Sequence, residues 1–238
     1  MKIELIAIHD ILSSMKNRSY QQYCGLAYAL DIIGERWTML IIRELITGPR
    51  RFTDLLEGLP GISTNLLSER LKSLEGQGLL YRRILPPPAG STVYELTPLG
   101  LALEKTLIEL GKWGSQFVPP APGEDSLLNV GSYALTLKTF FRPEKAQGVD
   151  DTYELHIDDE VLHVKISEGE VKVRQGEAPN ADLVLHTDMP TYLGMLTGQV
   201  QAEGAVSKGL VQIKGDSTEE ALEALTRFLR ICGVAISQ

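Results

Sequence analysis

The chain has 238 residues, of which 43% are apolar, so two domains can each bury a core. No apolar run approaches the roughly 18 residues that a membrane-spanning helix needs, and we therefore expect no membrane span. The formal net charge of −8 is unevenly distributed, because residues 1–120 hold 13 Lys and Arg against 12 Asp and Glu, whereas residues 121–238 hold 10 against 19. Between Arg36 and Arg83 there are eight basic and five acidic residues, and a locally basic half joined to an acidic half predicts two different tasks.

The first residues predict neither a secretion signal nor a disulfide framework. In "MKIELIAIHDILSSMK" the apolar stretch is broken by His9 and Asp10, and no small-residue cleavage site follows. We therefore expect a cytoplasmic protein, with residues 1–19 as an N-terminal extension. The two cysteines, Cys24 and Cys232, are far apart and form neither a disulfide pattern nor a zinc-ligand set.

Residues 20–118 predict a helical domain that contains one β-hairpin. The expected elements, in chain order, are helices over 20–33, 36–47 and 51–58, a longer helix that Ser63 caps and Gly78 ends, strands over 79–85 and 92–97, and a helix over 98–117. The last of these carries an apolar stripe near heptad spacing that ends in Trp113 and Phe117. Such a stripe predicts packing against a partner chain.

A short helix, a tight turn at Pro60-Gly61, a longer helix and a hairpin together predict a winged helix-turn-helix. On a helical wheel the longer helix buries one stripe of leucines: Leu67, Leu71 and Leu74. Short polar side chains, which can reach base edges or phosphates, occupy its other face and its N-terminal end. With basic residues of the preceding helix and of the hairpin, the predicted DNA contacts are Arg50, Arg51, Ser63, Thr64, Asn65, Ser68, Lys72, Arg82, Arg83, Ser91 and Thr92.

Two charged residues on the longer helix do not fit the pattern of its DNA-facing residues. Glu69 would repel phosphate unless it accepts a hydrogen bond from a cytosine amino group, so it argues against DNA contact. Arg70 falls beside the leucine stripe, and we expect it to brace the core or to pair with an acid rather than read a base.

The pieces "IGERWT", "GPRRF", "PGIS" and "LSERLKSLEGQGL", followed by "YELTPLG", appear in an order that resembles the HxlR family of bacterial winged-helix regulators. The resemblance runs from about Tyr23 to Gly114. It implies a homodimer that binds a palindromic operator in double-stranded DNA. In that family a cysteine stands just before the first long helix, where Cys24 stands here, and some members use it to sense oxidants or electrophiles.

The stretch "FVPPAPGED" predicts a semi-extended linker, which we place at residues 119–125. Residues 126–238 then predict a helix ending near Phe141, four strands of period two, a short helix over "MPTYLGMLTGQ", a last strand and a last helix over 218–232. We interpret the first strands as an antiparallel meander with one buried face. Helices that cover one face of an antiparallel sheet make this an α+β domain.

The order of these elements is similar to the sterol-carrier-protein fold, a lipid-binding domain. That resemblance implies an apolar tunnel between helices and sheet, suited to a fatty-acid-like ligand. The side chains expected near it are Met189, Leu193, Met195, Leu196, Ala205, Val206, Phe228 and Cys232. The alternative is that these residues only fill the core.

The sequence thus predicts a cytoplasmic, dimeric DNA-binding regulator whose second domain binds an apolar small molecule. Two alternatives remain: a lipid carrier whose helical half serves only for dimerisation, and a redox-sensing regulator that acts through Cys24. No catalytic motif is present, and the four histidines lack a metal-ligand spacing such as H-E-x-x-H. We therefore expect no enzyme, no metal and no cofactor beyond the apolar ligand.

Overall fold

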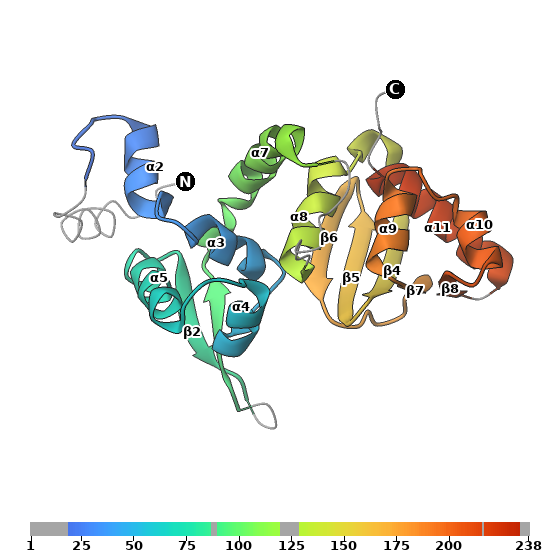
Figure 1. Cartoon of the computed structure of the whole chain (residues 1–238), viewed down its shortest axis with the longest axis horizontal. Coiled ribbons are helices and arrows are strands. Elements are labelled where there is room, and N and C mark those ends of the chain that lie inside the picture. The colour runs from blue at the N-terminus through green and yellow to red at the C-terminus, as the bar shows by residue number, and fades with distance from the viewer. Residues whose placement is uncertain (1–18, 87–89, 120–128, 216, 234–238) are drawn as a thin grey trace. The chain divides into compact units, whose positions relative to one another are not determined.

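The computed structural model describes residues 19–86, 90–119, 129–215 and 217–233. The chain divides between Leu107 and Ile108 into two compact units, and each is described by itself (Figure 1). The predicted N-terminal extension and linker lie outside the described residues, except for Ser19 and Pro119. No helix within the described ranges is both long and apolar enough to cross a bilayer.

The first part of the chain folds as a helix-turn-helix with a small sheet. Its elements are α2 (Gly25–Ile33), α3 (Thr38–Ile46), β1 (Arg50–Arg51), α4 (Phe52–Gly58), α5 (Thr64–Gly76), β2 (Leu80–Ile84), β3 (Thr92–Leu96), α6 (Pro98–Leu101) and the first residues of α7 (Glu104–Gly114), while the rest of α7 and η1 (Ser115–Phe117) belong to the second unit. The strand order is β1-β3-β2, with both neighbours of β3 antiparallel to it. The hairpin of β2 and β3 is the predicted wing.

Two of the predicted helices begin later than expected, for local reasons. Residues before α2 fold back on it, because the Asp31 carboxylate accepts hydrogen bonds from Ser19 Oγ at 2.9 Å and from the Tyr20 backbone N–H at 3.0 Å. Helix α3 begins only at Thr38, because Trp37 has a left-handed backbone conformation with φ of 79°. A bulky side chain rarely adopts this conformation, and it interrupts the helical path.

The predicted continuous helix over 98–117 is wrong, since the chain forms three short pieces there. Thr97 Oγ1 accepts from the Gly100 N–H and donates to the Gly78 carbonyl, which fixes α6 beside the start of β2. A Cβ atom at Gly100 would lie 2.1 Å from the Leu79 carbonyl oxygen, so only glycine permits this approach. The Leu103 N–H then bonds to the Gly100 carbonyl three residues back, which tightens the chain before α7.

The second part of the chain has one five-stranded sheet with helices packed on it. Its elements are α8 (Val130–Phe140), η2 (Pro143–Lys145), β4 (Asp150–Ile157), β5 (Glu160–Ser167), β6 (Glu170–Gln175), β7 (Leu183–Thr187), α9 (Met189–Leu196), α10 (Ala202–Ser207), β8 (Val211–Lys214) and α11 (Thr218–Cys232). Figure 1 shows α8, α9 and α11 on one face of the sheet. Alternate residues of the central strands are fully buried beneath them, including Tyr153, Leu155, Leu162, Val164, Leu183 and Leu185.

The predicted antiparallel meander is wrong at its fourth strand. The strand order is β6-β5-β4-β7-β8, and β7 pairs with β4 in parallel, so the sheet is mixed. The segment after β6 therefore crosses to the far side of β4. Two contacts hold the crossing segment to β4: Ala178 N–H donates to Glu154 Oε2 at 2.7 Å, and Asp182 Oδ2 accepts from the Thr152 N–H at 2.7 Å. The alternation of apolar and polar residues along a strand predicts which face of the strand is buried. It does not predict which other strand will pair with it.

Candidate functional site

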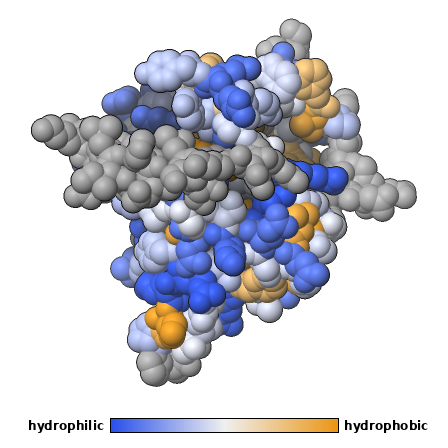
Figure 2. All heavy atoms as spheres, turned by 90° about the vertical axis from the view of Figure 1, so that its left-hand side faces the viewer, coloured by the Kyte–Doolittle hydropathy of each residue, from blue (hydrophilic) through white to orange (hydrophobic). Residues whose placement is uncertain are grey.

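Helix α5 presents its polar side to solvent. Ser63 caps it, since Ser63 Oγ accepts from the Leu66 N–H at 3.3 Å, as predicted. The stripe of Leu67, Leu71 and Leu74 is buried, with at most 1% of each residue exposed. The predicted DNA-facing residues of the helix are all exposed: Thr64, Asn65, Ser68 and Lys72. Figure 2 views the side of the chain on which Figure 1 draws α5, and hydrophilic residues cover much of the lower half of this face, with smaller apolar patches among them.

The Arg70 side chain holds α5 in place from its flank, which confirms the expected bracing role. Its Nη2 lies 3.0 Å from Glu35 Oε2, and its Nε donates to the Arg36 carbonyl at 3.3 Å. Its Nη1 donates to Glu69 Oε1 at 3.0 Å. Glu69, which we expected to repel phosphate, is thus partly neutralised by a neighbour on the same helix.

The two arginines before α4 differ in position. Arg51 is exposed at the N-terminus of α4, where its backbone N–H donates to Asp54 Oδ2 at 2.9 Å. Arg50 is only 5% exposed, and its Nη2 donates to Thr47 Oγ1 at 3.2 Å. The burial of Arg50 is contrary to its predicted contact with phosphate. In the antiparallel register Arg50 is paired with Tyr94 of β3, and this pairing places it in the body of the domain.

The wing carries its arginines on β2. Arg83 lies 2.8 Å from Glu95 on the paired strand, and Arg82 lies 3.8 Å from Glu75 on α5. Both side chains are about half exposed, so each can exchange its acid for a phosphate at little cost. Thr92 is exposed and Ser91 half-buried near the wing tip, whose residues 87–89 lie outside the described part of the chain.

Large apolar side chains are exposed on the helices that flank the helix-turn-helix. On α2 and just before it these are Tyr23, Leu26, Tyr28 and Leu30. On α7 and η1 they are Leu110, Trp113 and Phe117, with the Trp113 and Phe117 rings 5.0 Å apart in an edge-to-face contact. Scattered apolar residues on a surface are ordinary, but a series at helical spacing is typical of a face that another chain covers.

Cys24 is exposed at the N-cap position of α2. The nearby backbone N–H groups of Ala27 and Leu26, in the first turn of the helix, lower the pKa of its thiol. Helix N-termini favour thiolates in this way, because their free N–H groups face the sulfur. Cys232 differs, since burial raises the pKa of its thiol to about 12.

The eight predicted ligand contacts lie together in the helical layer of the second part. Leu193 and Val206 are half-buried, and the others are buried: Met189, Met195, Leu196, Ala205, Phe228 and Cys232. Phe228 packs on Tyr153 with ring centroids 4.9 Å apart. This packing fits a core and a ligand site equally, so the ligand contacts stay a prediction.

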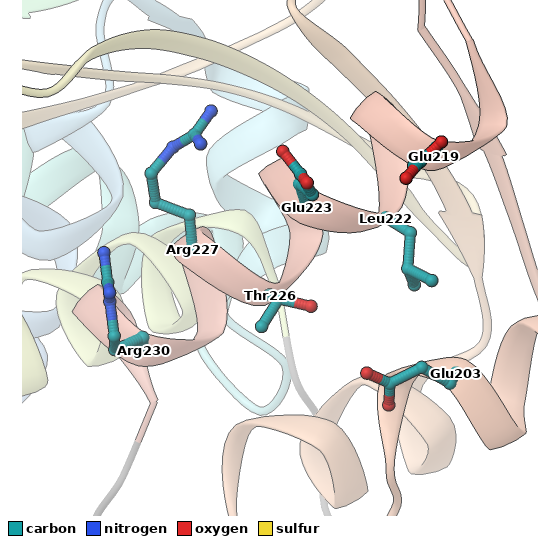
Figure 3. Close-up of a pocket in the computed structure, with 7 residues that line it drawn as sticks. All are labelled: Glu203, Glu219, Leu222, Glu223, Thr226, Arg227 and Arg230. Atoms are coloured by element: carbon teal, nitrogen blue, oxygen red, sulfur yellow. The ribbon is translucent and has the colours of Figure 1, made fainter.

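A groove between α10 and α11 has a different character (Figure 3). It has a volume of about 430 Å³ and is lined by Glu203, Glu219, Leu222, Glu223, Thr226, Arg227 and Arg230. Figure 3 shows Leu222 pointing from α11 toward Glu203 on α10. With three acids and two arginines around one leucine, this groove does not match the predicted apolar tunnel.

Sequence reasoning missed the polar contacts that the strands assemble. His156 and His186 stack with ring centroids 4.1 Å apart, and His156 Nε2 lies 2.6 Å from Glu154 Oε1. His156 and His186 occupy paired positions on β4 and β7, so their contact can be predicted only once the register of these two strands is known. Within the described ranges, no three His, Cys, Asp or Glu side chains are grouped so as to hold a metal ion.

Both parts of the chain match known families. Residues 32–122 match the HxlR-like helix-turn-helix family, and residues 136–223 match the SCP-2 sterol transfer family. The HTH-type transcriptional regulator YodB of Bacillus subtilis is 40% identical over 92 residues, which cover 39% of this chain and 82% of YodB. The uncharacterized HTH-type transcriptional regulator YvaP of the same organism is 39% identical over 93 residues, covering 39% of this chain and 86% of YvaP. A crystal structure of quinone-bound YodB aligns at 37% identity and a TM-score of 0.34, covering 39% of this chain and 97% of that chain.

Proposed function

Since this chain belongs, through residues 32–122, to the HxlR-like helix-turn-helix family, we propose that it is a homodimeric transcriptional regulator that binds a palindromic operator in duplex DNA. The observation that carries the proposal is the exposed polar face of α5 beside an arginine-bearing wing. Binding to an operator places the protein with the chromosome, in the cytoplasm. No catalytic step is proposed.

The geometry of α5 supports entry into a major groove. The short side chains Thr64, Asn65 and Ser68 allow the helix to approach base edges closely, and its N-terminus directs the positive end of the helix dipole toward phosphates. Asn65 can bond to both N6 and N7 of adenine, which would give sequence preference. Arg51, Lys72, Arg82 and Arg83 would contact the backbone and set the register.

Dimerisation is supported by the exposed apolar side chains of α2 and α7. A palindromic operator requires two copies of the recognition helix related by a twofold axis. Each of these two apolar faces can be covered by a second copy of the chain, and burying it would supply apolar contact area to a dimer.

Replacing Arg51 with Ala should weaken binding to every duplex by a similar factor. A phosphate contact carries no sequence information, so the slope of log K against log salt should also fall by about 1. The adjacent Arg50→Ala is the matched control: because Arg50 is buried, this change should instead lower the free energy of unfolding by about 1–3 kcal/mol. Fluorescence anisotropy and thermal unfolding separate the two effects. Loss of affinity for one sequence alone would contradict the backbone role of Arg51.

For the second part of the chain we propose that an apolar small molecule, such as a fatty-acid-like one, binds within the helical layer and shifts the dimer between states of different operator affinity. Such control requires that the ligand bind the two states unequally, and a coupling of about 1–3 kcal/mol is ordinary. The match of residues 136–223 to the SCP-2 sterol transfer family supports this proposal. If the protein carried lipid and did not bind duplex at low salt, the lipid-carrier alternative would replace the regulator.

A second candidate function is thiol-based sensing through Cys24. The exposed position of Cys24 and the lowered pKa of its thiol favour it. Solved structures of the relative YodB include quinone-bound, diamide-treated and reduced forms.

If Cys24 is the sensor, treatment with diamide or a quinone should change operator affinity at least about fivefold, the lower end of ordinary coupling. Cys24→Ser should abolish that response, whereas Cys232→Ala should keep it, because the Cys232 thiol is buried and protonated. Anisotropy titrations before and after treatment measure the operator affinity of each variant. An unchanged response in Cys24→Ser would remove this candidate.

Native mass spectrometry of the purified protein, with and without DNA from its own upstream region, tests the proposed function. We expect a dimer that binds the duplex, with an additional mass of a few hundred daltons per chain if the ligand co-purifies. A dimer that binds the duplex without this additional mass would agree with the proposed regulator and count against a co-purifying ligand. A monomer that ignores the duplex would overturn the proposal.

A further inference from the structure

Three consecutive residues before α3, Glu35, Arg36 and Trp37, are attached both to α5 and to the turn that leads into it. Arg70 of α5 reaches across to them, since its Nη2 lies 3.0 Å from Glu35 Oε2 and its Nε donates to the Arg36 carbonyl at 3.3 Å. The Trp37 ring lies 3.7 Å from the position that a Cβ atom of Gly61 would occupy, in ordinary van der Waals contact. These contacts hold the segment beside the first half of α5.

The backbone at Trp37 explains how the segment leaves α3. Trp37 is the N-cap residue of α3 and has a left-handed conformation with φ of 79°, which bulky residues rarely adopt. Such conformations persist only where the surrounding structure determines them, and they are concentrated at functional sites. Because α3 begins only after Trp37, Arg36 stays outside the helix, and its side chain can lie over the Trp37 ring.

The Arg36 guanidinium is exposed and stacked on this ring. Its Cζ lies 5.2 Å from the centroid of the Trp37 ring, which is the geometry of a cation–π contact. No acid in the described part of the chain forms an ion pair with Arg36, and the adjacent Glu35 is engaged by Arg70. A guanidinium that lies flat on an aromatic face keeps the N–H donors at its edge available to an anion.

We propose that Arg36 contacts a phosphate of the operator at the edge of the groove that α5 enters. The inference rests on the proposed function and adds to its DNA contacts a residue that the helical wheel of α5 does not include. The planar fork of a guanidinium fits two phosphate oxygens at once. A phosphate contact beside the recognition helix fixes the register of that helix on the duplex without reading a base.

The first test compares Arg36→Ala with the wild type, both as full-length protein, by anisotropy. Affinity for the upstream duplex and for a scrambled duplex should fall by the same factor, about two- to fivefold for each copy bound, as for an exposed ion pair. The slope of log K against log salt should fall by about 0.9 for each copy. The thermal unfolding midpoint should stay close to that of the wild type, because the side chain is exposed.

Lys105→Ala is the matched control for the change in net charge. It removes one positive charge from an exposed position on α7, outside α5, its preceding turn and the wing. It should leave both the affinity and the salt slope close to those of the wild type. Arg36→Lys should keep the salt slope but bind more weakly than the wild type, because an ammonium retains the charge and loses the planar fork.

The second test locates the contact on the duplex. Upstream duplexes are prepared with one phosphate in each half-site replaced by an uncharged methylphosphonate, a different phosphate in each duplex. At one position the replacement should weaken binding by the wild type about two- to fivefold for each copy, and it should leave binding by Arg36→Ala unchanged.

The outcomes separate this inference from the proposed function. Equal binding by the wild type and Arg36→Ala, or the absence of any phosphate whose replacement affects the two proteins differently, would overturn the inference and leave the regulator intact. A loss of affinity confined to the upstream duplex would also overturn it, because Arg36 would then contact a base. A wild-type protein that does not bind duplex DNA at 50 mM salt would overturn both.

Discussion

Trp113→Glu should convert the protein to a monomer and lower its affinity for a palindromic operator by about 100-fold or more, the loss expected when two linked contacts become one. Trp113 is 61% exposed on α7 and lies beside Phe117, so a charge there would be buried unpaired in any interface that this face forms. Analytical ultracentrifugation and anisotropy measure the two effects.

The control for this prediction is Lys105→Glu on the same helix. Lys105 is exposed and lies about 80° around the helix from Trp113, on its polar side, so the change adds negative charge without entering the apolar face. It should leave the dimer intact. The thermal unfolding midpoint of the Trp113→Glu monomer should stay close to that of the wild type, because an exposed side chain contributes little to the core. A dimeric Trp113→Glu protein with full operator affinity would show that α7 is not the interface.

Asn65→Ala should lower sequence preference by about 1–3 kcal/mol, a 5- to 150-fold drop in the ratio of operator to scrambled-duplex affinity. The side chain is exposed at the first turn of α5, opposite the buried leucines, and it can bond to both adenine positions. Affinity for scrambled duplex should change little.

Ser73→Ala is the matched control for Asn65. Ser73 is also exposed on α5, but it lies two turns toward the C-terminus and away from the polar face that Asn65 shares with Lys72. Its replacement should leave the affinity ratio unchanged. A uniform loss of affinity in Asn65→Ala, with the ratio preserved, would assign Asn65 to the DNA backbone instead of a base.

Local patterns were sufficient to predict the helix-turn-helix. The leucine stripe of α5 and the Ser63 cap depend on residues three or four apart, which a helix brings together whatever the rest of the chain does. The same reasoning gave the last helix its observed bounds, Thr218–Cys232. Where a single residue decides the backbone path, as Trp37 does by its left-handed conformation and Gly100 by its lack of a side chain, the predicted helices were too long.

Features that depend on distant residues could not be predicted in this way. The parallel pairing of β4 with β7 depends on where the segment after β6 crosses, and contacts from Ala178 and Asp182 hold that path. Arg50 and Arg51 are neighbours in sequence, yet the pairing of β1 with β3 buries one and exposes the other. The contact of the Trp37 ring with the turn at Gly61 likewise joins residues that are distant in sequence.

The acidic second half gives the regulator a further electrostatic property. With 10 Lys and Arg against 19 Asp and Glu, residues 121–238 carry a negative charge that we expect to weaken binding to every duplex alike. Under the proposed function, this would disfavour non-specific DNA, while sequence-dependent base contacts would retain the protein at its operator.

The most direct test of the account is the affinity of the full-length protein for its own upstream duplex, measured by anisotropy from 50 to 200 mM salt against a scrambled duplex of equal length. We predict tighter binding of the upstream duplex throughout. We also predict that affinity for both duplexes falls steeply with salt, by about 10³- to 10⁵-fold if six to ten phosphates are contacted. Absence of binding at 50 mM salt, or equal affinity for the two duplexes across the whole range, would contradict a sequence-specific DNA-binding regulator.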